Sequence, residues 1–259
     1  FFYGLSDGNY QIALSDQNGC SVQAGPIFID EPEKLIFDSL IISNVNCFNA
    51  ADGELSVFVS GGVPPMTYTL FPMPGQTLNH FEKFTNGHYY VRVSDANACC
   101  VDSFFTITQP PALNASVYPQ HVSCFGGNDG AISVNAFGGI APYQYQWNIN
   151  DTGSSISNLT AGAYELTVTD QNNCEKVFQQ IITEPEAIML NVSPDRLICA
   201  GDTARFIATA TGGHLPYTYY WNNLQGIDTF SLQTSANIPV EIFITDGNNC
   251  ISDTITRNI

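Results

Sequence analysis

Apolar and polar residues alternate in short runs along most of the chain, and clusters of turn-forming residues separate the runs. Between residues 113 and 188 the runs are Ala131–Phe137, Tyr143–Asn148, Tyr164–Thr169 and Val177–Thr183. Such period-two alternation predicts strands with one buried face, and the Gly, Pro and Asn clusters between them predict turns. Because the runs follow one another at roughly 8 to 12 residue spacing and no stretch has helical periodicity, the sequence predicts β-sandwiches.

Three phrases recur along the chain in a fixed order. The first, Asp-x-Asn-x-Cys, begins at intervals of 79, 75 and 76 residues, at Asp16, Asp95, Asp170 and Asp246. The second, Gly-Gly followed by Pro and Tyr, occupies 61–68, 138–145 and 212–219. The third, an apolar residue followed by Gly-x-Tyr, occupies 5–10, 84–89 and 159–164. Near the end of the chain, Val240 stands where a fourth copy would have the Tyr. Self-similarity at a fixed period indicates tandem repeats.

The repeats predict one truncated unit and three whole ones of about 75 residues: 1–35, 36–112, 113–188 and 189–259. Within a unit, Leu159, Gly162 and Tyr164 have the spacing of a tyrosine corner, in which the phenol bonds backbone upstream. Trp147 and Trp221 each follow two residues after a Tyr, at the place of the core tryptophan of an immunoglobulin-like domain. The expected fold class is therefore all-β, with tandem immunoglobulin-like sandwiches.

The joints between units are short and rich in proline, at 109–111 and 184–186. An immunoglobulin-type unit is expected to have seven strands, an odd number, so the chain enters at one pole and leaves at the other. Proline stiffens the linkers. The sequence thus predicts an extended, semi-rigid rod.

Charge and cysteine content narrow the class of protein. Seven basic and 24 acidic residues give a net charge of −17, which would repel nucleic acid and anionic lipid. No apolar run approaches the length of a membrane span, and the chain begins within a strand-like pattern, as a fragment of a longer protein would. Eight cysteines at regular spacing indicate an oxidising, extracellular compartment.

Each whole unit carries one early and one late cysteine, 52, 50 and 51 residues apart. The constant spacing predicts a disulfide within each unit, which would stabilise it by about 4 kcal/mol in the chain-entropy model. The predicted pairs are Cys47–Cys99, Cys124–Cys174 and Cys199–Cys250. Cys20 has no assigned partner, and Cys100 is either an alternative partner for Cys47 or a free thiol. Zinc is disfavoured because Cys-x-x-Cys pairs are missing and the histidines do not follow the repeat.

No motif typical of catalysis is found in the sequence, and the chain is not expected to be an enzyme. The best candidates for a site are Asp95, Asp170 and Asp246, whose carboxylates together with the neighbouring Asn could ligate calcium. The alternative is that these residues stabilise tight turns, as Asp and Asn often do. The glycine-rich segment 126–130 precedes a strand rather than a helix and is expected to be a turn.

The segments 124–130, 138–147 and 164–174 resemble the SprB-type repeat of giant surface adhesins from gliding Bacteroidetes. The resemblance is strong over 113–188, good over 36–112 and looser over 189–259, which is more similar to a PKD-like module. It implies export by type IX secretion, display on the cell surface, and a part in adhesion and gliding motility. It also implies O-glycosylation at the Asp-Ser/Thr motifs, on Ser39, Thr203 and Thr254.

The predicted function is that of a stalk that holds an adhesive tip away from the cell, with neighbouring repeats as partners and surface polysaccharide or substratum as a further one. Two alternatives remain. The units could bind glycans through exposed aromatics such as Tyr118 or Tyr220, or they could be accessory modules of a secreted hydrolase.

Overall fold

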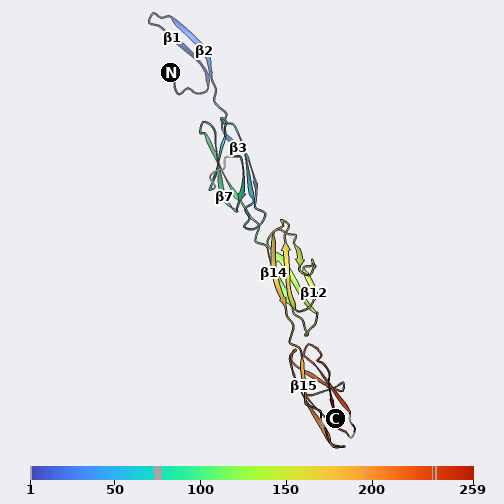
Figure 1. The fold of residues 1–259 in the computed structure, drawn as a ribbon. Helices are drawn as coiled ribbons and strands as arrows, with labels where there is room; N and C mark the ends of the chain where they lie inside the picture. Colours follow the sequence, from blue (N-terminus) through green and yellow to red (C-terminus); the bar gives the residue numbers. More distant parts are fainter. Residues whose placement is uncertain (1, 73–77, 196, 235, 237) are drawn as a thin grey trace. The chain divides into compact units, whose positions relative to one another are not determined.

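The computed structural model describes residues 2–72, 78–195, 197–234, 236 and 238–259, and these residues form strands and turns without a helix. The chain divides into two compact units, residues 1–112 and 113–259. Figure 1 shows the strands gathered in separate groups, which together make up seven small antiparallel sheets. The predicted all-β class is confirmed.

The first group is a hairpin of β1 (Gly8–Ser15) and β2 (Ser21–Ile29), joined by the turn of Asp16. Apolar side chains on both strands stay exposed, among them Leu14 and Phe28. The hairpin has the same Asp-x-Asn-x-Cys turn as the last two strands of the sandwiches described below.

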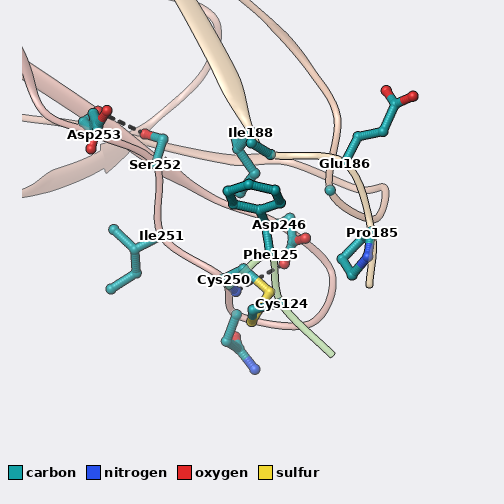
Figure 2. A pocket seen from close by; sticks show the side chains of 13 residues that line it. Cys124, Phe125, Pro185, Glu186, Ile188, Asp246, Cys250, Ile251, Ser252 and Asp253 are labelled. Carbon is teal, nitrogen blue, oxygen red and sulfur yellow. Dashed lines mark hydrogen bonds between the residues drawn. A yellow bond between two sulfur atoms is a disulfide. The ribbon is translucent and has the colours of Figure 1, made fainter. Parts of the chain in front are cut away.

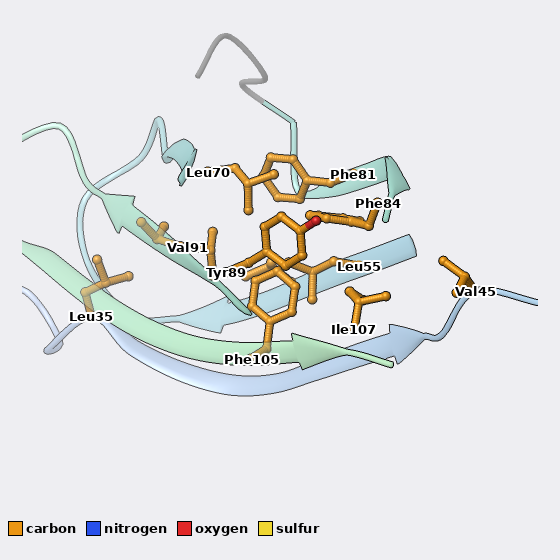
Figure 3. Close-up of a cluster of buried hydrophobic side chains, with 12 residues drawn as sticks. Leu35, Val45, Leu55, Leu70, Phe81, Phe84, Tyr89, Val91, Phe105 and Ile107 are labelled. Atoms are coloured by element: carbon orange, nitrogen blue, oxygen red, sulfur yellow. The ribbon is translucent and has the colours of Figure 1, made fainter. Parts of the chain in front are cut away.

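In residues 36–112 two three-stranded sheets pack face to face, in the orders β3-β4-β6 and β5-β7-β8. Buried and exposed positions alternate along the central strands, as sequence alternation requires of a sheet with one face inward. Figure 3 shows the core between the sheets, where the rings of Phe84, Tyr89 and Phe105 lie within 4.8–5.6 Å of one another. The strands are β3 (Ile36–Ser43), β4 (Gly53–Ser60), β5 (Thr67–Phe71), β6 (His80–Phe84), β7 (Gly87–Ser94) and β8 (Cys100–Ile107).

Residues 113–188 repeat the arrangement, with sheets β9-β10-β12 and β11-β13-β14 around a separate core that contains Trp147 and Leu166. The strands are β9 (Asn114–Gln120), β10 (Gly130–Phe137), β11 (Gln144–Trp147), β12 (Ser155–Leu159), β13 (Gly162–Thr169) and β14 (Glu175–Ile182).

Residues 189–259 form a third core around Phe206 and Trp221, between sheets β15-β16-β19 and β18-β17-β20-β21. The short strand β18 has no counterpart in the sandwich of residues 113–188. The strands are β15 (Met189–Val192), β16 (Thr203–Thr211), β17 (Thr218–Trp221), β18 (Leu224–Gly226), β19 (Thr229–Gln233), β20 (Pro239–Thr245) and β21 (Ile255–Asn258).

The strand order identifies the immunoglobulin-like topology. In residues 113–188, β9, β10 and β12 correspond to strands A, B and E of an immunoglobulin domain and form one sheet. The strands β11, β13 and β14 correspond to strands C, F and G and form the other sheet. Six strands rather than the expected seven build the sandwich of residues 113–188, and the described residues of 36–112 also form six. The expectation of seven strands is therefore wrong for residues 113–188.

The chain nevertheless crosses each of these two sandwiches an odd number of times. In residues 113–188, β11 pairs only with the second half of β13, and β12 pairs only with the first half of β10. Because each covers half of the sandwich, β11 and β12 together make one crossing. The first strand therefore begins at one end, here called the N-terminal pole, and the last strand ends at the other, the C-terminal pole.

The recurring tyrosine and tryptophan have the predicted roles. The Tyr164 hydroxyl donates to the Thr160 carbonyl at 2.9 Å, and Tyr89 donates in the same way to Thr85 at 3.0 Å. Trp147, only 2% exposed, donates from its indole N–H to the Gly153 carbonyl. The tyrosine corner and the core tryptophan expected from the sequence are confirmed.

Candidate functional site

The Asp-x-Asn-x-Cys phrase and the Gly-Gly phrase meet at the N-terminal pole of each whole sandwich. Asp170 is 2% exposed, and its Oδ1 accepts backbone N–H bonds from Asn172 and Cys174, each at 2.9 Å. Its Oδ2 accepts the N–H of Ile140, the residue after the Gly-Gly pair, at 2.9 Å. One carboxylate thus fixes the turn and ties it to the loop that connects β10 to β11.

The glycine of this contact is needed because the carboxylate lies directly against it. Gly139 has a φ of +56°, and a Cβ built on it would lie 2.5 Å from Asp170 Oδ2. Gly213 repeats the feature, with a φ of +59° and a distance of 2.6 Å to Asp246 Oδ2. An L side chain would be strained at this φ and would also displace the carboxylate.

The other two aspartates make the same three bonds. Backbone N–H groups donate to Asp95 at 2.8–3.0 Å, and the bond from Val63 is the main cause that lowers the pKa of this carboxyl. Burial raises the pKa of Asp246, but the N–H bonds from His214, Cys250 and Asn248 outweigh it and the net pKa is lowered. Such bonds favour the ionised form.

These contacts agree with the turn interpretation of Asp95, Asp170 and Asp246 rather than with the calcium alternative. In each case both carboxylate oxygens already accept backbone N–H groups. Among the described residues, no group of three or more His, Cys, Asp or Glu side chains is placed to hold a metal ion.

The early cysteine of residues 113–188 lies at the C-terminal pole. Cys124 belongs to the loop between β9 and β10, and this loop is bonded to the end of the last strand. Val122 N–H donates to the Thr183 carbonyl at 3.0 Å, and Gly126 N–H donates to the Glu184 carboxylate at 2.6 Å. The loop therefore marks the place where the chain leaves the sandwich.

The late cysteine lies at the opposite pole. Cys174 belongs to the turn between β13 and β14, the turn that Asp170 ties to the loop after β10. The eight-residue strand β13 separates the two poles, which corresponds to roughly 26 Å at about 3.3 Å per residue. A disulfide needs Cα atoms within about 7 Å. Early and late cysteines of one sandwich therefore cannot pair.

The structure instead joins two consecutive sandwiches by the disulfide Cys124–Cys250, which spans 126 residues. Figure 2 shows this bond between the C-terminal pole of residues 113–188 and the turn of Asp246 in the last sandwich. Next to it, the Asn248 side-chain amide donates to the Ser123 carbonyl at 3.1 Å. The predicted pairs Cys124–Cys174 and Cys199–Cys250 are therefore wrong.

The remaining cysteines complete the correction. Cys47 and Cys174 each take part in a disulfide, whereas Cys99 is a free thiol, so the predicted pair Cys47–Cys99 is wrong as well. The free cysteines are exposed, and they are Cys20, Cys99, Cys100 and Cys199. The alternative of a free Cys100 is confirmed.

A hollow of about 520 Å³ lies beside the disulfide and is lined by both sandwiches and the linker between them. Phe125 follows the cysteine and lines the hollow together with Pro185 and Ile188 of the linker, as Figure 2 shows. Asp246 forms part of the same wall. The disulfide, the linker and the recurring Asp-x-Asn-x-Cys turn therefore belong to one joint.

A second feature is a row of aromatic rings on the outer face of β5, β7 and β8. The rings of Phe71 and Tyr90 stack with centroids 4.6 Å apart, and the ring of Phe104 lies 5.5 Å from that of Tyr90. Phe104 is 81% exposed. The outward positions of alternating runs are the signal that could have identified this row.

The aromatics singled out in the sequence lie elsewhere. Tyr118 is exposed on β9, and Tyr220 is half-buried and stacks on Phe243 with centroids 4.9 Å apart. The predicted glycosylation sites Ser39, Thr203 and Thr254 are all exposed. They remain predictions.

Within the part of the chain that the structure describes, no helix has the length and apolar character of a membrane span.

Comparison with known proteins gives one family and a set of structural neighbours. The family model described as the SprB repeat matches residues 39–72 and 119–152, which lie in the first halves of two consecutive sandwiches. No curated protein matches the chain.

The structural neighbours are tandem immunoglobulin and fibronectin modules. They include a chain from the crystal structure of Dpr2 Ig1–Ig2 in complex with DIP-Theta Ig1–Ig3, with 9% identity, 88% of this chain and 98% of that chain covered, and a TM-score of 0.30. The eight N-terminal Ig domains of Down Syndrome Cell Adhesion Molecule have 10% identity and a TM-score of 0.34, and the match covers 97% of this chain and 40% of that chain. The fibronectin(III)-like modules of Clostridium thermocellum CbhA have 11% identity and a TM-score of 0.26, and the match covers 56% of this chain and 93% of that chain.

Proposed function

We propose that the chain is a repeat region of a large secreted cell-surface adhesin, in which it serves as a load-bearing stalk. The SprB-repeat matches at equivalent segments of two sandwiches support this proposal. In a gliding bacterium of the Bacteroidetes, such a stalk would be exported by type IX secretion and would transmit the force of gliding to an adhesive tip. The last sandwich, with its additional strand, is proposed as a PKD-like module of the same stalk.

The observation that carries the proposal is the position of the disulfide relative to the two poles. The last strand of residues 113–188 leaves at the pole where Cys124 lies, and Cys250 belongs to the N-terminal pole of the next sandwich. The linker and the disulfide therefore connect the same two poles in parallel. Tension that unravels either sandwich is taken up by the disulfide before the intervening strands can extend.

Force spectroscopy of the full chain, held at its two ends, tests this role. The 126-residue interval between the bonded cysteines corresponds to about 440 Å of extended chain at about 3.5 Å per residue. We expect the fully unravelled length to increase by at least this amount when a reductant is added. Chain that has been reduced and alkylated beforehand is the control and should show no further increase. An unravelled length that does not change on reduction would contradict a load-limiting role.

Glycan binding is the second candidate, and the row of Phe71, Tyr90 and Phe104 favours it. Outward-facing aromatic rings present apolar faces on which sugar rings can stack, and Phe104 is largely exposed. A glycan array with the full chain separates the two candidates, since a stalk without a binding role should give no signal. A signal that disappears in Phe104→Ser but persists in Tyr118→Ser would establish the row as the site.

A further inference from the structure

Cys199 occupies in the last sandwich the position that Cys124 occupies in the preceding one. It lies in the loop between the first two strands, β15 and β16, at the C-terminal pole. The local turn is the same in both loops, since Asp202 N–H donates to the Cys199 carbonyl at 3.0 Å and Gly127 N–H donates to the Cys124 carbonyl at 3.0 Å. Cys199 is exposed and is a free thiol.

The partner of this position is known from the joint in residues 113–259. There the partner is the cysteine of an Asp-x-Asn-x-Cys turn, which three backbone N–H bonds to the aspartate hold in a fixed shape. The Asn at the third position of the turn adds a hydrogen bond to the carbonyl before the paired cysteine. The Asp-x-Asn-x-Cys turn thus has a fixed shape that fits the loop of the paired cysteine.

We propose that Cys199 is a covalent docking site for the Asp-x-Asn-x-Cys turn of a further sandwich of the same type. The general rule is that the loop cysteine at the C-terminal pole of one sandwich bonds the turn cysteine at the N-terminal pole of the sandwich that follows. The free turn cysteines Cys20 and Cys99 are the complementary half of the same device, because both belong to Asp-x-Asn-x-Cys turns and both are exposed.

The bond forms by thiol–disulfide exchange with a low-molecular-weight disulfide of the glutathione type. The Cys199 thiolate attacks one sulfur of this oxidant and releases one small thiol. The thiolate of the turn cysteine then displaces the second small thiol and forms the protein disulfide. The two protein thiols lose two electrons and two protons, which leave with the two small thiols.

An extended chain tests the proposal. Residues 183–259, which contain the native linker and the last sandwich, are appended after Ile259 of the full chain, and the product is refolded with oxidised and reduced glutathione. Peptide mapping without reduction should then show Cys199 linked to the appended copy of Cys250. Cys124 should stay linked to the original Cys250.

The matched control is Cys199→Ser in the same extended chain. It should leave the appended turn cysteine reactive towards iodoacetamide while the Cys124–Cys250 link persists, which shows that the protein has folded. If Cys199 and the appended cysteine both stay reactive in the parent chain, the proposal is wrong. The mapping needs no adhesive activity, so its failure is distinguishable from a failure of the proposed stalk function.

Discussion

Removal of the Asp170 carboxylate should destabilise the sandwich of residues 113–188 more than any surface substitution. The side chain accepts three backbone N–H groups and is 2% exposed. A buried donor left without its acceptor costs about 1–3 kcal/mol. Because water can reach part of a turn, we expect Asp170→Ala to lower the free energy of unfolding by about 3–5 kcal/mol.

Asp170→Asn separates the charge from the geometry. The amide oxygen can still accept the two bonds at the position of Oδ1, but its NH₂ group would face the Ile140 N–H, donor against donor. We expect a loss of about 2 kcal/mol, between the wild type and the alanine variant. Glu175→Ala, on an exposed position of β14, is the control and should change stability by less than about 0.5 kcal/mol.

The assay is urea unfolding of the full chain in a Trp221→Phe background. The chain has two tryptophans, so the remaining fluorescence reports on Trp147 and hence on this sandwich alone. Wild-type protein in the same background gives the reference midpoint. An Asp170→Ala transition within about 1 kcal/mol of that reference would refute the assignment of three structural bonds to this carboxylate.

Two further predictions concern the aspartates of the other turns and the tyrosine corner. The pKa values of Asp95 and Asp246 are lowered in the folded state, so their contribution to stability is present above the unfolded pKa of about 3.9 and is lost as the pH falls through the folded value. In thermal unfolding, the midpoint temperature should fall steeply below about pH 4 and hardly change between pH 5 and 7. A midpoint temperature that rises on acidification would contradict this prediction. Tyr164→Phe removes the hydroxyl bond to the Thr160 carbonyl and should lower the free energy of unfolding by about 1–2 kcal/mol, measured by Trp147 fluorescence. The control Tyr118→Phe, at an exposed position, should leave this free energy unchanged. Equal effects of both substitutions would argue against the tyrosine corner.

The strands and the turns could be predicted from the sequence because each depends on a local pattern of residues. The alternation of Ala131–Phe137 predicts β10 with its buried face, and Asp170 followed by Asn172 predicts a tight turn. What the sequence did not show is that the same carboxylate also bonds Ile140, thirty residues earlier. That contact depends on how the sheets pair, for which no single phrase carries a signal.

The cysteine pairing failed for a related reason. In a chain of equal repeats, any two fixed positions recur at a constant interval, so a spacing of 50 residues between Cys124 and Cys174 does not imply that they meet. The observed interval of 126 residues between Cys124 and Cys250 is equally regular, since it is 50 plus the repeat of 76. Only the assignment of the loop and the turn to opposite poles distinguishes the two schemes.

The central claim is that a disulfide joins the sandwich of residues 113–188 to that of residues 189–259 instead of closing each one. The most direct test is alkylation of the unreduced full chain with iodoacetamide, followed by peptide mapping without reduction. We predict a peptide pair linked through Cys124 and Cys250, with alkylation of Cys20, Cys99, Cys100 and Cys199. A peptide pair that links Cys124 to Cys174, with Cys99 and Cys199 protected from alkylation, would contradict it.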